Sequence, residues 1–158
     1  MTIGEIIEKI KKFPHACAVI TGGEPLIHPQ LPLLTNALAK QNFHITVETT
    51  GIIFRKIKCD LLSLSPKPPK AFNPSAIKKL IKNAPDYQIK FVIEDKKNIL
   101  QIRKILKNHK FIDRGKVMLM PNAKTLKLYK VQAPKIAKLS LHENLRFSPR
   151  LHLETKLK

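Results

Sequence analysis

Gly22-Gly23-Glu24-Pro25 is the segment whose residue types and spacing point most directly to chemistry. Two adjacent glycines let the backbone turn sharply and let a ligand approach the main chain closely. The exposed N–H and C=O groups could bind the charged ends of a ligand, and the carboxylate of Glu24 could accept an ammonium group. The alternative is an ordinary turn from a strand into a helix, in which the glycines serve geometry alone.

Polar residues also follow other apolar runs of the sequence. After one such run, Ser65-Pro66-Lys67 offers a hydroxyl that could meet a sugar and an ammonium that could meet an anion. The alternative here is a strand stop followed by a solvated lysine. Further segments of this kind are Glu48-Thr49-Thr50-Gly51, Glu94 and Met120-Pro121-Asn122.

The elements that must position these residues alternate between helix and strand patterns. Helices are predicted over 2–12, 29–41, 74–84, 96–109 and, more weakly because Pro134 could break it, 123–138. Strands are predicted over 16–21, 45–49, 61–65, 89–93, 117–120 and 145–153. The continuous apolar run at 16–21 is typical of a strand buried on both faces.

This alternation predicts an α/β fold with parallel strands, in one domain over residues 1–158. In such sheets ligands bind at the carboxyl ends of the strands, where the polar segments above would lie. Local signals support two helix starts. Thr2 followed by Glu5 indicates a capping box, and Asn73-Pro74 combines a helix cap with a proline at the first helical position.

The net charge of +19 is the most extreme property of the composition. It favours a polyanion as partner, but only five of the 30 basic residues are arginine, the type that contacts phosphate and base edges in pairs of hydrogen bonds. No run of five like charges occurs. We expect the lysines to form a solvated coat on helix faces, for example at Lys78, Lys79, Lys97 and Lys104.

The apolar runs, the N-terminus and the cysteines of the sequence indicate in which cellular compartment the protein is expected. No apolar run reaches the 18–20 or so residues that span a bilayer, and the N-terminus is not typical of a secretory signal. Cys17 and Cys59 are too few and too far apart for a disulfide scaffold or a metal knuckle. We expect a cytoplasmic protein without a membrane partner.

Six motifs together resemble those of the 7-carboxy-7-deazaguanine synthases, which are radical S-adenosylmethionine enzymes of queuosine and 7-deazapurine biosynthesis. In chain order they are Thr21–Leu26, Glu48–Gly51, Ser65–Lys67, Lys90–Val92, Met120–Pro121 and Arg150–His152. The resemblance covers essentially the whole chain. It implies a partial (βα) barrel of the radical S-adenosylmethionine type and a carbon–nitrogen lyase that converts 6-carboxy-5,6,7,8-tetrahydropterin to 7-carboxy-7-deazaguanine.

The resemblance also implies a role for each motif. The implied contacts with S-adenosylmethionine begin at its amino group, continue along the ribose and carboxylate, and end at the adenine. In chain order the residues are Gly22, Gly23, Glu24, Ser65, Pro66, Lys67, Met120, Pro121, Asn122 and Ala123. Contacts with the pterin are implied for Thr21, Arg150 and His152, the last two in the final strand. Family members pair as dimers, so a homodimer is a further expectation.

One part of the family pattern is missing from the sequence. The family holds a [4Fe–4S] cluster on a loop with three cysteines and binds Mg²⁺ beside it, and neither Cys17 nor Cys59 can substitute. We therefore assign no metal ligand and no catalytic residue, and we expect a truncated chain that lacks the first strand and the cluster loop. Whether it is active stays open. The alternatives are a module that binds S-adenosylmethionine or another nucleotide without a cluster, and a basic nucleic-acid-binding protein, of which the second is less expected.

Overall fold

The computed structural model describes residues 1–13, 16–94 and 96–155, which fall into two compact units. The first unit contains residues 1–64 and 73–87, and the second contains residues 65–72 and those from 88 onward. The single domain expected over residues 1–158 stays a prediction.

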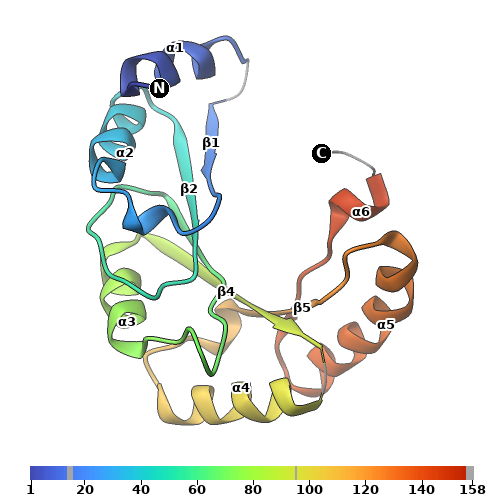
Figure 1. The fold of residues 1–158 in the computed structure, drawn as a ribbon. Coiled ribbons are helices and arrows are strands. Elements are labelled where there is room, and N and C mark those ends of the chain that lie inside the picture. The colour runs from blue at the N-terminus through green and yellow to red at the C-terminus, as the bar shows by residue number, and fades with distance from the viewer. Residues whose placement is uncertain (14–15, 95, 156–158) are drawn as a thin grey trace. The chain divides into compact units, whose positions relative to one another are not determined.

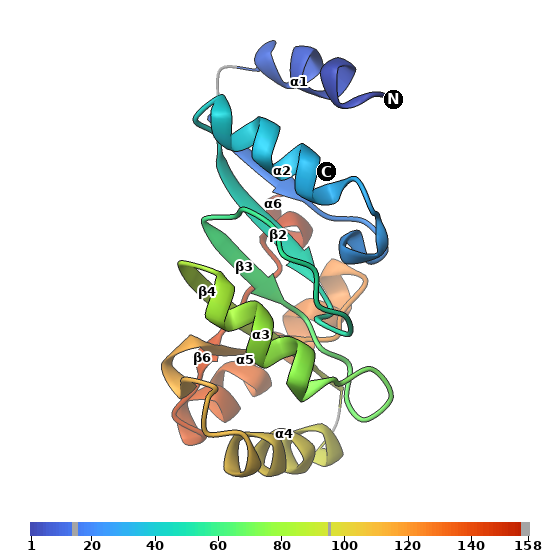
Figure 2. The ribbon, with the colours of Figure 1, turned by 90° about the vertical axis from the view of Figure 1, so that its left-hand side faces the viewer.

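The first unit is built on three parallel strands, β1 paired with β2 and β2 paired with β3. Its elements are α1 (Ile3–Lys11), β1 (Cys17–Ile20), a short 3-10 turn η1 (Pro25–Ile27), α2 (Leu31–Lys40), β2 (His44–Thr49), β3 (Leu61–Leu64) and α3 (Pro74–Asn83). Helices α2 and α3 lie on the same side of these strands, and α1 packs against α2 (Figures 1 and 2). The parallel β1–β2–β3 arrangement brings the carboxyl ends of the three strands to one edge.

The second unit repeats this plan, since β4 pairs with β5 and β5 with β6, again in parallel. Its elements are β4 (Asp86–Ile93), whose first two residues group with the first unit, α4 (Lys96–Asn108), a 3-10 turn η2 (Arg114–Lys116), β5 (Val117–Pro121), α5 (Leu126–His142), β6 (Arg146–Phe147) and α6 (Leu151–Thr155). Helix α5 packs on β5 and β6 (Figure 1).

The helix starts confirm the local signals in the sequence. At α1, the backbone N–H of Glu5 donates to the Thr2 hydroxyl at 3.2 Å and the Thr2 N–H donates to the Glu5 carboxylate at 2.7 Å. At α3, Asn73 accepts from the backbone N–H of Ala76 at 3.1 Å. Both pairs satisfy N–H groups that a helix leaves without partners inside itself.

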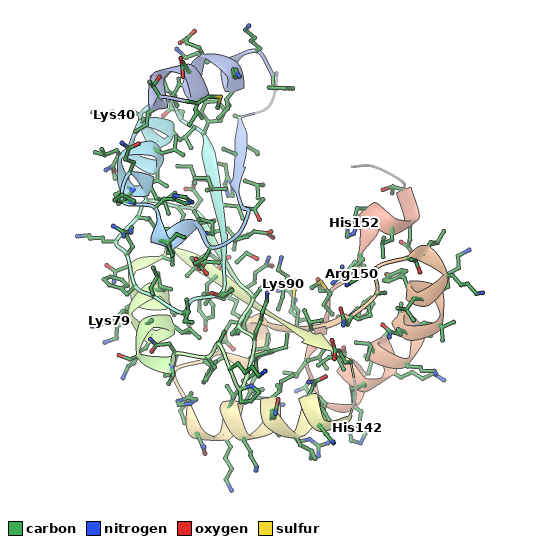
Figure 3. The ribbon with its side chains drawn as sticks, viewed as in Figure 1. Lys40, Lys79, Lys90, His142, Arg150 and His152 are labelled. Atoms are coloured by element: carbon green, nitrogen blue, oxygen red, sulfur yellow. The ribbon has the colours of Figure 1, made fainter. Side chains whose placement is uncertain are left out.

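The helices bury apolar stripes and expose lysines, as the sequence predicts. Ile77 and Leu80 of α3 and Ile102 of α4 are at most 3% exposed. The predicted surface lysines are exposed, at Lys78, Lys79, Lys97 and Lys104. Lys40 and Lys79 likewise point away from the strands of their unit (Figure 3). Much of the charge of +19 is therefore carried on solvated helix faces.

The prediction that strand 16–21 is buried on both faces is wrong. Cys17 is exposed, and Val19 exposes 62% of its surface, whereas Ala18 between them is buried. Within the described residues β1 pairs with β2 only, so β1 is an edge strand with one covered face. A continuous apolar run does not distinguish this case from a central strand.

The C-terminal third differs from prediction in two ways. Helix α5 continues through Pro134, because its buried Tyr129 and Ile136 hold it in place despite the missing N–H. The predicted strand over 145–153 is limited to Arg146–Phe147. Ser148 still donates its N–H to the carbonyl of Leu119, but Pro149 has no N–H to extend the ladder. Arg150 therefore lies outside any strand, and His152 lies on helix α6.

Across residues 1–13, 16–94 and 96–155, no helix combines the length and the apolar character needed to cross a membrane.

Gly51 is a position that only glycine fits. Its φ is +72°, and a Cβ there would lie 2.8 Å from Leu64 Cδ2 and 2.9 Å from Ile77 Cγ1. We predict that Gly51→Ala lowers the free energy of unfolding by about 1–3 kcal/mol, from backbone strain and overpacking. The matched control, Gly4→Ala on α1, places its Cβ in ordinary contact with Thr2 Oγ1 at 4.0 Å and should leave stability unchanged or slightly higher. Urea unfolding of both variants tests this, and equal stability of the two would contradict it.

Candidate functional site

The loop after β1 presents its main chain to open space. Gly22 and Gly23 have φ values of +104° and +59°, in the region that favours glycine. A Cβ built on either residue has no atom within 4 Å, and both residues are exposed. A ligand could therefore approach the peptide groups of this loop directly, as the sequence predicts.

The carboxylate of Glu24 fixes this loop to the end of β2. One oxygen, Oε1, accepts from the Thr49 hydroxyl at 2.5 Å and from the Leu26 N–H at 3.1 Å. The other oxygen, Oε2, accepts from the Thr50 N–H at 2.8 Å and also from the Thr50 hydroxyl. Thr49 in turn accepts from the N–H of Gly51 at 3.0 Å. Glu24 thus joins two loops that follow neighbouring strands.

These contacts change what Glu24 can do. Burial by itself raises the pKa of its carboxyl, but the hydrogen bonds from Thr49, Thr50 and Leu26 outweigh it and lower the pKa below the ordinary value. With four donors already on its two oxygens, the carboxylate supports the loop. The groups best placed to meet a ligand are the peptide groups of Gly22 and Gly23.

Thr21 is tied to the same pair of strands. Its hydroxyl donates to the carboxylate of Glu48 at 3.2 Å, and Thr21 itself is exposed. Thr21, Gly22, Gly23 and Glu24 therefore form one continuous surface on the carboxyl-end edge of β1 and β2 in the first unit. Their grouping agrees with the sequence prediction, while their predicted contacts stay predictions.

A cavity of about 470 Å³ lies within the second unit. It is formed by the segment after β3, the end of β4, the first turns of α4 and the residues that follow β5 and β6. Its lining residues are Pro66, Lys67, Pro68, Phe91, Val92, Glu94, Asn98, Gln101, Ile102, Asn122 and Arg150. The volume is in the range of pockets that hold small molecules.

Hydrogen bonds fix several polar groups around this cavity. The amide of Asn122 donates to Glu94 Oε1, and the backbone N–H of Glu94 donates to the side-chain oxygen of Asn98 at 2.8 Å. Arg150 Nε donates to the carbonyl of Pro121 at 2.9 Å, which joins the guanidinium to the end of β5. The cavity therefore carries two cations, Lys67 and Arg150, together with carboxylate and amide groups.

The cavity gathers only part of the predicted site. Pro66, Lys67, Asn122 and Arg150 line it together. Among the residues that the structure describes, its lining does not include Ser65, Met120, Pro121, Ala123 or His152. His152 is exposed on α6, and Arg150 lies in the segment just before it (Figure 3).

Sequence reasoning missed Asn98 and Gln101 as lining residues. They lie three residues apart on α4, the spacing that places two side chains on one helix face, and they follow Glu94 by one and two turns. A polar pair at this spacing, just after a strand whose carboxyl end is expected at the site, is a signal that could have found them.

The two cysteines do not form a metal centre. Cys17 is at the start of β1, where it pairs with His44, and Cys59 lies just before β3. Both are therefore at strand starts, away from the carboxyl ends. Burial, and secondarily the nearby charge of Asp60, raises the pKa of the Cys59 thiol to about 11, which disfavours the thiolate that binds metal. No group of three His, Cys, Asp or Glu side chains that could hold a metal occurs among the described residues.

No protein-family profile matches the chain. Individual curated proteins do match it. A 7-carboxy-7-deazaguanine synthase of Halobacterium salinarum is 31% identical over 180 residues, covering 97% of this chain and 70% of that protein. The protein of the same name from Rhodopirellula baltica is 27% identical, covering 96% of this chain and 66% of that protein.

Two solved structures share the fold. QueE of Escherichia coli superposes with a TM-score of 0.67 at 22% identity, covering 95% of this chain and 64% of that structure. SuiB of Streptococcus suis, solved with S-adenosylmethionine bound, gives a TM-score of 0.60 at 15% identity, covering 92% of this chain and 40% of that structure. These likenesses confirm the predicted fold class, an α/β fold of the radical S-adenosylmethionine partial-barrel type.

The lowered pKa of Glu24 makes the stability that it provides depend on pH. A lowered folded-state pKa stabilises the protein above the ordinary carboxyl pKa, and this contribution is lost as pH falls through the lowered value. We predict that Glu24→Gln costs about 1–3 kcal/mol of unfolding free energy at pH 7, because an amide NH₂ then faces the Thr50 donors. The cost should shrink below pH 4 or so.

The control is Glu8→Gln, which removes an exposed ion pair with Lys11 and should have an effect near zero at either pH. Urea unfolding at a series of pH values measures both variants. A Glu24→Gln cost that stays constant with pH would contradict the proposed role of the ionised carboxylate.

Proposed function

Because this chain belongs to the 7-carboxy-7-deazaguanine synthase family, we propose that it takes part in converting 6-carboxy-5,6,7,8-tetrahydropterin to 7-carboxy-7-deazaguanine. The observation that carries the proposal is the cavity of the second unit, which gathers Pro66, Lys67, Asn122 and Arg150. The chain spans less than two thirds of the E. coli structure that it resembles, at 64%. The proposed activity is therefore that of the whole family enzyme, to which this chain contributes binding surfaces.

The proposal assigns S-adenosylmethionine to the residues that the motifs indicate. Gly22 and Gly23 would bind the amino-acid end through their peptide groups, held in place by Glu24. Ser65, Pro66 and Lys67 would meet the ribose and carboxylate, while Met120, Pro121, Asn122 and Ala123 would line the adenine side. When reduced in a radical S-adenosylmethionine enzyme, this cofactor supplies the hydrogen-abstracting radical that starts the reaction.

Features of the structure support this assignment. The open space beside Gly22 and Gly23 admits a ligand to the main chain. Lys67 and Arg150 supply positive charge on the cavity wall, which suits a carboxylate because a charge-assisted hydrogen bond is roughly twice as strong as a neutral one. The chain's own part in the chemistry is thus to bind and orient its ligands and to exclude water from them.

The substrate assignments are part of the same proposal. Thr21, Arg150 and His152 would contact the pterin, which carries a carboxylate that a guanidinium can bind through two parallel hydrogen bonds. The bond from Arg150 Nε to Pro121 already limits the orientations of that guanidinium. A cytoplasmic location and pairing into a homodimer complete the proposal.

The iron–sulfur cluster and Mg²⁺ of the family do not fit the residues present. A cluster held by three thiolates needs one cysteine more than the two in this sequence, and both of those lie at strand starts. We therefore assign no step to either group within these 158 residues. Synthase activity would need thiolates from outside this sequence.

The same observation favours a second candidate function, a module that binds S-adenosylmethionine or a related nucleotide without a cluster. Both candidates use the loop at Thr21–Glu24 and the cavity of the second unit. They differ in whether the chain acts in synthesis once cluster thiolates are supplied by an upstream segment or by another polypeptide.

We predict that the chain, incubated anaerobically with ferrous iron and sulfide and then desalted, retains no stoichiometric [4Fe–4S] cluster. Two cysteines cannot supply the three thiolates, and only the pair Cys17 and Cys59 is available. Iron and sulfide analysis with visible absorption measures this, and the double variant Cys17→Ser, Cys59→Ser is the background. A cluster present in the wild-type chain but absent from that variant would contradict the assignment.

Binding of S-adenosylmethionine tests the proposed function itself. We predict measurable heat in calorimetry at millimolar ligand, and a loss of affinity of roughly tenfold to a hundredfold in Lys67→Ala, because a hydrogen bond to a charged group contributes about 1.5–3 kcal/mol. Lys40→Ala, an exposed lysine on α2, is the matched control and should bind as the wild type does. Absence of heat with the wild type, or equal losses in both variants, would overturn the proposal.

A further inference from the structure

We propose that a row of three aromatic side chains, Phe72, His109 and Phe111, positions Lys67 at the wall of the cavity in the second unit. The inference rests on the proposed function, in which the ammonium of Lys67 meets the carboxylate of S-adenosylmethionine. It adds positioning residues that lie outside the sequence motifs. Among the described residues, the cavity lining includes none of the three rings, so they would act on the ligand through Lys67.

The segment that carries Lys67 has little structure of its own to hold it. Residues 65–72 form neither a helix nor a strand of the sheet, and Lys67 is exposed. A lysine side chain has many rotamers, and ordering it together with a loose backbone lowers the affinity for a ligand. Lys67 can therefore contribute fully to binding only where the main chain beneath it is already fixed.

Two backbone hydrogen bonds close this segment into a turn. The N–H of Lys67 donates to the carbonyl of Ala71 at 3.0 Å, and the N–H of Ala71 donates to the carbonyl of Lys67 at 2.8 Å. The main chain of Lys67 is thus fixed relative to residue 71, whose neighbour in the chain is Phe72. Because both partners lie within the turn, these bonds do not attach it to the cavity, and any anchor at Phe72 acts directly on Lys67.

The ring of Phe72 provides such an anchor. Its centroid lies 5.5 Å from that of His109, and the two rings are tilted by 51°. The ring of His109 in turn lies 5.7 Å from that of Phe111, at 53°. Both distances fall within the range of favourable aromatic pairs, and all three side chains are half-buried. The turn is therefore held by a continuous row of rings.

His109 is a firm support because its backbone is fixed on both sides. Its N–H donates to the carbonyl of Ile105 at 2.9 Å, and its carbonyl accepts from the N–H of Ile112 at 3.0 Å. Both isoleucines are buried. His109 directly follows α4, and the first turns of the same helix line the cavity. One helix thus carries part of the cavity wall and also the ring that holds the Lys67 turn.

The consequence is an effect limited to the end of the ligand that Lys67 meets. Without the ring of Phe72 the other walls of the cavity stay in place, but binding must order the turn again. We expect Phe72→Ala to weaken binding of S-adenosylmethionine by about three- to tenfold, the range of an aromatic pair. The same variant should bind 5′-methylthioadenosine, which has the nucleoside but no carboxylate, as the wild type does.

Calorimetry on the full chain with these two ligands is the experiment. Lys67→Ala should show the same pattern as Phe72→Ala, with weaker binding of S-adenosylmethionine only. His109→Ala removes the same ring contact from the other side and serves if Phe72→Ala does not fold. His109→Phe keeps a ring and should restore the wild-type affinity within about twofold. The matched control is Phe13→Ala, because the ring of Phe13 is 67% exposed in the first unit.

The two ligands distinguish positioning from a general structural role. Equal weakening of both ligands in Phe72→Ala would mean that the ring maintains the whole cavity, and would overturn the inference. Unchanged binding of S-adenosylmethionine in that variant, or a loss in His109→Phe as large as in His109→Ala, would also overturn it. In these cases the effect of Lys67→Ala would still support the proposed function. No binding of S-adenosylmethionine to the wild type would overturn both.

Discussion

The candidate site of the first unit depends on the hydrogen bonds that the carboxylate of Glu24 accepts. Fixing the backbone of one residue costs about 1–2 kcal/mol in conformational entropy, and adjacent glycines lose more than other residues. Gly22 and Gly23 have no side chains with which to offset that cost. The four hydrogen bonds to Glu24, at about 1 kcal/mol or more each, compensate by fastening the loop to Thr49, Thr50 and Leu26.

In the second unit, the polar groups of the candidate site are positioned in a different way. Its cavity is bounded by the segment that follows β3 and by residues at the ends of β4, β5 and β6, with α4 supplying one wall. The side chains of Asn122 and Arg150 donate hydrogen bonds to Glu94 and to the carbonyl of Pro121, respectively. Its polar groups are thus positioned by neighbouring loops, while apolar side chains form the rest of the lining.

Local sequence signals predicted much of the fold because their physical causes are local. Thr2 with Glu5 and Asn73 with Ala76 cap helices through bonds that span three residues. The failures have non-local causes. The exposure of Val19 depends on which strands flank β1, and α5 continues past Pro134 because of its packing on β5 and β6.

The candidate site likewise has features that the sequence indicates and features that depend on tertiary packing. The Gly22-Gly23-Glu24 motif could be found from residue types, but the four donors to Glu24 come partly from Thr49 and Thr50, 25 and 26 residues away. Gln101 lies outside the motifs, and although its spacing from Asn98 is a signal for it, the face that α4 turns toward the cavity decides its lining role. Residue types indicate the chemistry, and tertiary packing decides which groups remain available for it.

We propose that the loops at the carboxyl ends of the strands bind S-adenosylmethionine. Its most direct test is a titration of the ¹⁵N-labelled chain with this ligand, followed by backbone amide chemical shifts. Binding at these loops predicts saturable shifts at Gly22, Gly23, Lys67 and Asn122, with little change on the lysine-rich faces of α3 and α4. Shifts confined to those lysine faces, or none at millimolar ligand, would contradict it.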